Sequence, residues 1–356
     1  MKIVELIPSL HQRGGAEVLL LSLSSEFKKM NNNVVVITLY DVVDDKIIEF
    51  LIKNNITLYT CGKKRGIDLK ASRRLSNYIN IINPDVIHLH LNVISSFYLK
   101  FFFKKIKFKV FLTIHNLFTK DFNFIERFVI RQKAYSGQLG LVGISDLITN
   151  DVSKYIKKPH IFTIYNGAYL FSPSTHKETD HLTIVNIATF RAQKNHKLLL
   201  DSFNEIYKKG FNNIILVLVG GGELFDYYVN YSEKLECHKN VFFRGKQNDV
   251  LPYLKNADIF CLSSSFEGNP ISIIEAMSVG LPIIAPSIGG IPDVVIDKEN
   301  GFLFNVDNKQ DLISKLLELI NNPNLRAIMR KNNIKRSKEY DISKCAKEYY
   351  KIFIGE

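Results

Sequence analysis

The sequence lacks the features of several large classes of protein. No uninterrupted apolar run approaches the ~20 residues that a membrane-spanning helix needs. The opening Met1–Pro8 is too short and contains an acid, so no signal peptide is expected. The few cysteines show neither metal-ligand spacing nor a disulfide pattern, which predicts reduced thiols and a cytoplasmic protein. They are Cys61, Cys237, Cys261 and Cys345.

Two short motifs are also missing. The Gly-x-Gly-x-x-Gly fingerprint of dinucleotide-binding folds does not occur, which disfavours a nicotinamide oxidoreductase. No Asp-x-Asp pair occurs either, so a metal-bridged diphosphate is not expected. We therefore expect no metal and no cofactor.

Positive charge is concentrated in the first half of the chain. The net charge is +12, and residues 1–166 carry 24 lysines and arginines against 13 acids. Residues 167–356 carry 23 against 22. A basic half predicts an acidic partner, such as nucleic acid, anionic lipid or a phosphate-bearing substrate.

Apolar runs typical of buried strands alternate with helical stretches along the whole chain, which predicts an α/β fold with doubly wound parallel sheets. The expected strands are 2–8, 34–39, 56–59, 86–91, 109–114, 139–144, 161–165, 182–188, 214–219, 241–245, 258–262 and 282–285. Amphipathic helices are expected at roughly 308–338 and 343–354. At 356 residues the chain is long enough for two such domains, and the polar segment 172–180 has the composition of a linker between them.

One turn between a strand and a helix combines two carboxylates with an anion-binding geometry. Glu267 is predicted in the loop, and Glu275 about two turns inside the helix. Gly268 and Asn269 allow a sharp turn, and Pro270 suits a first helical position. The amides of such a helix start favour an oxygen-rich or anionic ligand. An acid that only stabilises the helix dipole is the simpler alternative.

Two glutamates eight residues apart around a Gly-Asn-Pro turn resemble the Glu-x7-Glu motif of retaining nucleotide-sugar glycosyltransferases, family 4 in particular. Gly14, Gly15 and Glu17 match the family's Gly-Gly-x-Glu loop, and Thr113-Ile114-His115 matches its Thr-x-His element. The resemblance covers essentially the whole chain. It is strongest over 182–295 and weakest over 40–105.

The resemblance implies the GT-B fold, in which two Rossmann-like domains face each other across a cleft. The acceptor-binding domain is expected at 1–170 and the nucleotide-sugar-binding domain at 171–340. The last helix, 341–356, is expected to cross back onto the first domain.

The resemblance also implies a set of site residues. His115, Glu267, Lys194 and Arg191 are the implied catalytic residues, with the two cations neutralising a leaving diphosphate. The family's arginine usually lies five residues before the lysine, where this chain has Thr189, so the assignment of Arg191 departs from the pattern. His88 and His90 are expected to be structural or acceptor-side residues. The implied nucleotide-sugar-binding residues are Gly14, Gly15, Arg191, Lys194, Gly220, Gly245, Glu267, Gly268, Asn269, Pro270, Ile271 and Glu275.

Lysines alternate with aromatic residues over Phe97–Lys109, and further basic residues lie over Lys63–Arg74. The first pattern is typical of a segment that binds an anionic membrane surface. Helix core with a solvated edge is the alternative. No recognisable nucleic-acid-binding module accompanies these charges, so nucleic acid is not the expected partner.

The resemblance implies transfer of a sugar, with retention, from a nucleotide diphosphate-sugar (UDP-sugar expected) to an acceptor hydroxyl. The basic first half of the chain favours a lipid-linked or glycolipid acceptor. Capsule, O-antigen or lipopolysaccharide synthesis at the inner face of the cytoplasmic membrane would use such an enzyme. A sugar-nucleotide epimerase on the same scaffold, or a non-catalytic partner of a glycosyltransferase, are the alternatives.

Overall fold

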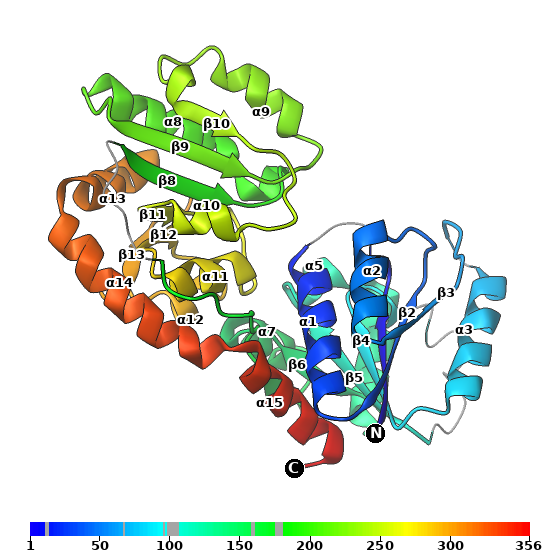
Figure 1. The fold of residues 1–356 in the computed structure, drawn as a ribbon. Coiled ribbons are helices and arrows are strands. Elements are labelled where there is room, and N and C mark those ends of the chain that lie inside the picture. Colours follow the sequence, from blue (N-terminus) through cyan, green and yellow to red (C-terminus); the bar gives the residue numbers. More distant parts are fainter. Residues whose placement is uncertain (11–13, 67, 95–96, 98–106, 158–160, 175–180) are drawn as a thin grey trace. The chain divides into compact units, whose positions relative to one another are not determined.

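A computed structural model describes residues 1–10, 14–66, 68–94, 97, 107–157, 161–174 and 181–356. The chain forms two compact units (Figure 1). One is Met1–Gly167 with Ile342–Glu356, and the other is Ala168–Asp341. Within the described ranges, no helix combines the length and the apolar composition needed to cross a lipid bilayer.

The first unit contains a seven-stranded parallel sheet with the order β3-β2-β1-β4-β5-β6-β7. Its strands are β1 (Lys2–Ile7), β2 (Asn33–Thr38), β3 (Thr57–Thr60), β4 (Val86–His90), β5 (Lys109–Ile114), β6 (Gly140–Gly143) and β7 (Ile161–Thr163). Its helices are α1 (Gly15–Lys29), α2 (Asp45–Lys53), α3 (Leu69–Ile82), α5 (Phe118–Asp121), α6 (Phe124–Tyr135), α7 (Asp146–Ser153) and α15 (Ile342–Ile354).

The first sheet has its topological switch point between β1 and β4. The chain builds outward from β1 to β2 and β3, and then resumes on the other side with β4. Helices consequently cover both faces of the sheet (Figure 1). Helix α15 packs on α1 within this unit, where the rings of Phe27 and Phe353 lie 5.6 Å apart. The predicted return of the last helix to the first domain is confirmed.

The second unit contains a six-stranded parallel sheet with the order β10-β9-β8-β11-β12-β13. Its strands are β8 (Leu182–Ile187), β9 (Ile214–Val219), β10 (Val241–Phe243), β11 (Ile259–Cys261), β12 (Ile283–Pro286) and β13 (Gly301–Phe304). Its α-helices are α8 (His196–Lys208), α9 (Phe225–Ser232), α10 (Leu251–Lys255), α11 (Ile271–Val279), α12 (Ile291–Val294), α13 (Lys309–Asn321) and α14 (Pro323–Ser337). The switch point lies between β8 and β11.

The two parallel sheets confirm the predicted fold class, and most strands lie within two residues of their predicted bounds. One predicted helix needs correction, and one strand was missed. The helix expected over 308–338 is two helices, because Pro323 lacks the N–H that would continue α13. Strand β13 was not predicted at all. Residues 98–106 of the predicted membrane segment, and residues 175–180 of the predicted linker, lie outside the described residues.

Candidate functional site

The loops that follow the strands of the second sheet are tied together at its carboxyl edge. The Phe190 amide donates to the Gly221 carbonyl at 3.0 Å, and the Gly220 amide donates to the Gly245 carbonyl at 2.9 Å. A Cβ on Gly220, whose φ is +149°, would overlap the carbonyl oxygen of Ala188. The triple glycine therefore allows three loops to meet at one edge. Ligands bind at this edge of doubly wound sheets.

Lys194 is held in place at the switch point of this sheet. It lies in a short 3-10 turn between β8 and α8, and the Ser263 hydroxyl after β11 donates to its carbonyl at 3.0 Å. The Lys194 ammonium lies 2.5 Å from Glu267 Oε1, which also accepts a hydrogen bond from the Ser264 hydroxyl at 2.6 Å. The loops after β8 and β11 thus fix both charges. Ser263 and Ser264 were not predicted as site residues.

The Lys194–Glu267 pair is largely removed from solvent, with side-chain exposures of 20% and 7%. An ammonium group has three N–H donors, so Lys194 can contact an anion while it keeps its bond to Glu267. Arg191, the second predicted cation, is exposed on the same loop, at the start of the 3-10 turn. Two cations therefore lie at the edge where the sequence predicted diphosphate binding.

The turn from Glu267 to α11 packs against a second loop, which contains Gly289 and Gly290. The Gly290 amide donates to the Glu267 carbonyl at 3.2 Å. Gly289 has a φ of +63°, and a Cβ there would overlap the Glu267 carbonyl. Asn269 is buried in the turn. Pro270 is the N-cap of α11 rather than its first helical residue, so Ile271 opens the helix. Gly268 is partly buried, between the buried Glu267 and Asn269.

Glu275 lies in the second turn of α11, nearer the start of the helix than the sequence predicted. Ser272 and Glu275, three residues apart, form the partly exposed face of a helix whose other residues are all buried. The carboxyl of Glu275 has no hydrogen-bond partner in the part of the chain that the structure describes. Burial raises its pKa to about 7. A group that donates hydrogen bonds to this carboxylate would relieve the desolvation of its charge.

Gly14 and Gly15 lie at the carboxyl end of β1, beside the switch point of the first sheet. Gly15 is the first residue of α1, and Gly14 is its N-cap, which makes no side-chain capping bond. A Cβ on Gly14 would meet the carboxylate of Glu17 at 2.5 Å. The start of this long helix therefore presents backbone amides at the functional edge of the sheet.

His115 follows β5 at the same edge and belongs to a network that the sequence did not reveal. Its Nε2 lies 3.4 Å from His90 Nδ1, and His90 Nε2 lies 2.8 Å from Glu5 Oε2. His88 Nδ1 lies 3.0 Å from the same carboxylate oxygen, and its Nε2 lies 2.7 Å from the Thr113 hydroxyl. Glu5, His88 and His90 have side chains with no solvent exposure.

The ligand-type atoms of Glu5, His88 and His90 are close enough together to surround a metal ion. The same atoms also satisfy one another by hydrogen bonds. The position is fully buried in the middle of the sheet, so a hydrogen-bonded network accounts for these contacts. Sequence signals for it did exist, namely an acid inside an apolar strand and two histidines on one face of another.

The protonation of the network follows from burial. Burial alone would raise the pKa of Glu5, but the two histidines outweigh it and lower that pKa to about 2. Burial, followed by the neighbouring His88, lowers the pKa of His90 to about 4. Burial, followed by His90, holds the pKa of His115 well below its ordinary value. At neutral pH, Glu5 is ionised, whereas the rings of His90 and His115 are neutral.

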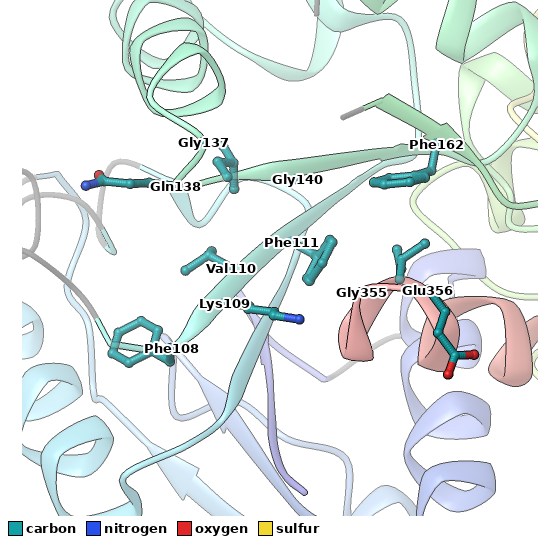
Figure 2. Close-up of a pocket in the computed structure, with 12 residues that line it drawn as sticks. Phe108, Lys109, Val110, Phe111, Gly137, Gln138, Gly140, Phe162, Gly355 and Glu356 are labelled. Carbon is teal, nitrogen blue, oxygen red and sulfur yellow. The ribbon is translucent and has the colours of Figure 1, made fainter. Parts of the chain in front are cut away.

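A cavity of about 430 Å³ lies at the opposite edge of the first sheet (Figure 2). Phe108, Phe111 and Phe162 supply aromatic walls. Lys109, the first residue of β5, points to the end of α15 and donates to the Phe353 carbonyl at 2.9 Å. Because the cavity lies at the amino ends of the strands, it is separate from the edge where His115 and the glycine pair lie.

Comparisons with known proteins agree with this division into two units. The family model described as "Glycosyltransferase Family 4" matches residues 13–170. The model described as "Glycosyl transferases group 1" matches residues 171–336.

The chain spans about half the length of two relatives that it matches in sequence. An uncharacterized glycosyltransferase of Haemophilus influenzae is 32% identical over 54% of this chain and 55% of its own length. The UDP-Gal:alpha-D-GlcNAc-diphosphoundecaprenol alpha-1,3-galactosyltransferase of Escherichia coli is 30% identical over 50% of this chain and 49% of its own. The Anabaena protein HepE, solved in complex with UDP-glucose, superposes with a TM-score of 0.84 at 18% identity, and the match covers 100% of both chains.

Proposed function

Because this chain belongs to the group 1 glycosyltransferases of the family 4 type, we propose that it transfers a sugar from a UDP-sugar to a lipid-linked or glycolipid acceptor, with retention and without a metal ion. The product would enter a bacterial surface polysaccharide such as capsule, O-antigen or lipopolysaccharide. The donor is assigned to the second unit and the acceptor to the first.

The observation that carries the donor assignment is the pairing of cations and a carboxyl at the switch point of the second sheet. Lys194 and Arg191 neutralise the leaving diphosphate, which is the largest electrostatic demand of such a reaction. Glu275 accepts hydrogen bonds from the ribose hydroxyls, which gives its half-buried carboxylate partners that the described residues do not supply. Solved HepE holds UDP-glucose, and the E. coli relative is named for a UDP-sugar.

In this proposal Glu267 does not bind the donor sugar, although the Glu-x7-Glu motif implies that role. Its carboxylate is already bonded to Lys194 and Ser264. We therefore assign it to holding the ammonium in position, while the backbone amides from Gly268 to Ile271 bind the donor sugar. The absence of an Asp-x-Asp pair from the sequence supports neutralisation by side-chain cations and amides.

The donor assignment is tested by thermal shift with UDP-glucose, UDP-galactose, UDP-N-acetylglucosamine, GDP-mannose and ADP-glucose. A ligand that binds only the native state raises the melting temperature. We expect UDP-sugars to stabilise the protein and Glu275→Gln to abolish that effect. The exposed Glu299→Gln is the matched control. Stabilisation by a GDP- or ADP-sugar instead, or by none of the five, would contradict the proposal.

The acceptor class is inferred from charge and from relatives. The E. coli relative is named for an undecaprenol diphosphate acceptor. In the first unit, Lys64 and Arg65 are exposed beside the basic start of α3. We propose that this surface attracts the enzyme to an anionic membrane, where each Lys or Arg contributes about 1 kcal/mol.

Liposome flotation tests the membrane proposal. The double variant Lys64→Glu/Arg65→Glu is expected to float less with vesicles that contain anionic phosphatidylglycerol. The matched control, Lys331→Glu/Lys335→Glu, makes the same charge change on exposed positions of the second unit. Equal flotation of the wild type with neutral and anionic vesicles would reject the proposal.

A further inference from the structure

Each hydrogen bond of the buried network in the first unit has a defined donor and acceptor, and the contacts of Glu5 determine which is which. Its ionised carboxylate can only accept hydrogen bonds, so both histidine nitrogens that face it must carry protons. Those nitrogens are His88 Nδ1 and His90 Nε2, at 3.0 and 2.8 Å from Oε2. The two histidine nitrogens are also 3.2 Å apart, but the shorter, charge-assisted bonds to the carboxylate are the stronger ones.

A neutral imidazole with a proton on Nε2 has a lone pair on Nδ1. For His90, this lone pair faces His115 Nε2 at 3.4 Å. His115 must therefore carry its proton on Nε2, because two lone pairs would repel each other. Its remaining ring nitrogen, Nδ1, is then an acceptor on a half-buried residue at the carboxyl end of β5.

We propose that Glu5 and His90 are positioning residues that hold His115 as a neutral Nε2–H tautomer, with the Nδ1 lone pair available to substrate. The relay runs from the carboxylate through one imidazole to the next. Carboxylates that accept the N–H of an active-site histidine fix its tautomer in the same way in other proteins. The role of the relay in turnover rests on the proposed function and on the catalytic role that the family resemblance implies for His115. The tautomer itself does not.

The network has a second arm that serves as an internal control. His88 Nε2 lies 2.7 Å from the Thr113 hydroxyl, which in turn lies 2.9 Å from the Tyr349 hydroxyl on α15. This arm shares Glu5 with the relay but does not contact His115. Tyr349→Phe removes the far end of the arm and leaves the bonds from Glu5 through His90 to His115 in place.

The test uses the full chain labelled with 15N-histidine. Long-range proton–nitrogen NMR correlations identify the tautomer of each ring, and His→Gln variants assign His90 and His115 among the nine histidines. We expect both rings to be neutral Nε2–H tautomers at pH 7.5. A charged ring at position 115, or a proton on its Nδ1, would overturn the proposal without any variant. Stoichiometric metal in the purified protein would overturn it as well.

Glu5→Gln then tests the direction of the relay with little change in volume. The amide group of the glutamine donates to one of the two histidines, so the tautomers of His90 and His115 become mixed or inverted. We expect kcat to fall by at least ~10-fold, since a positioned acid–base group contributes about 10²–10⁴-fold. The KM for the UDP-sugar should be unchanged, because the donor is assigned to the second unit.

Tyr349→Phe is expected to keep the wild-type tautomers and kcat, with at most a lower melting temperature. If Glu5→Gln changes the tautomer of His115 but not kcat, the role of the relay in turnover is wrong. If the wild-type tautomers are as stated but no UDP-sugar binds, the proposed function fails and the relay stands.

Discussion

Glu275 gives a prediction in which stability and function change in opposite directions. Burial raises the pKa of its carboxyl from the ordinary 4.5 to about 7. Each pKa unit corresponds to about 1.4 kcal/mol, so ionised Glu275 lowers the free energy of unfolding by about 3 kcal/mol. Glu275→Gln removes this charge, and we expect it to stabilise the unliganded protein by up to about 3 kcal/mol at pH 8.

The upward direction of the pKa shift of Glu275 determines how the stability gain from Glu275→Gln depends on pH. The folded state holds the Glu275 proton more tightly than the unfolded state does, so this residue's destabilisation grows as the pH rises from about 4.5 to about 7. Below pH 4.5 the carboxyl is protonated in both states and the penalty disappears. The gain from Glu275→Gln should therefore be full at pH 8 and nearly absent at pH 4.5.

The assay is denaturant unfolding of wild type, Glu275→Gln and the control Glu299→Gln at both pH values, followed by circular dichroism. Titration calorimetry with UDP-glucose on the same proteins measures the functional cost. We expect Glu275→Gln to be the most stable of the three at pH 8 and the weakest in binding. A variant that is destabilised equally at both pH values, or that binds UDP-glucose like the wild type, would refute the reasoning.

Three further predictions concern the same edge of the second unit. Lys194→Met leaves Glu267 buried without its cation, so unfolding assays should show a loss of stability on the order of 3 kcal/mol. Transfer assays should show the loss of most of the turnover. Gly289→Ala should lower the melting temperature and the affinity for UDP-glucose, because the added Cβ overlaps the Glu267 carbonyl. The control is Gly210→Ala, at a φ of +93° with open space around it, which measures the backbone strain alone. The affinity for UDP-glucose should rise between pH 6 and pH 8 as the carboxyl at 275 ionises, and a flat profile would count against its role as an acceptor.

Much of the fold could be predicted because buried parallel strands are nearly continuous apolar runs. The strand at 109–114 was predicted to the residue for this reason. Strand β13 was missed because it has only four residues and opens with a glycine, which resembles a turn. The break before Pro323 had a signal in the sequence, since the residue before a proline is disfavoured in a helix.

In the candidate site, the positions of the loop residues could be predicted from the sequence, but their contacts could not. The residues expected at the carboxyl edge of the second sheet do follow its strands, because loop positions can be read from strand ends. The bond from Lys194 to Glu267 could not be predicted, since it joins loops 73 residues apart. The contacts of Glu5 with His88 and His90 depend on β1 and β4 being neighbours across more than 80 residues of sequence. Sequence periodicity carries no information of that kind.

The central claim is that a nucleotide diphosphate binds at the switch point of the second sheet. A crystal structure of the protein with UDP tests it most directly. We predict the diphosphate within hydrogen-bonding distance of the Lys194 ammonium and the ribose hydroxyls on the Glu275 carboxylate. UDP bound elsewhere, with neither side chain in contact with it, would contradict the account.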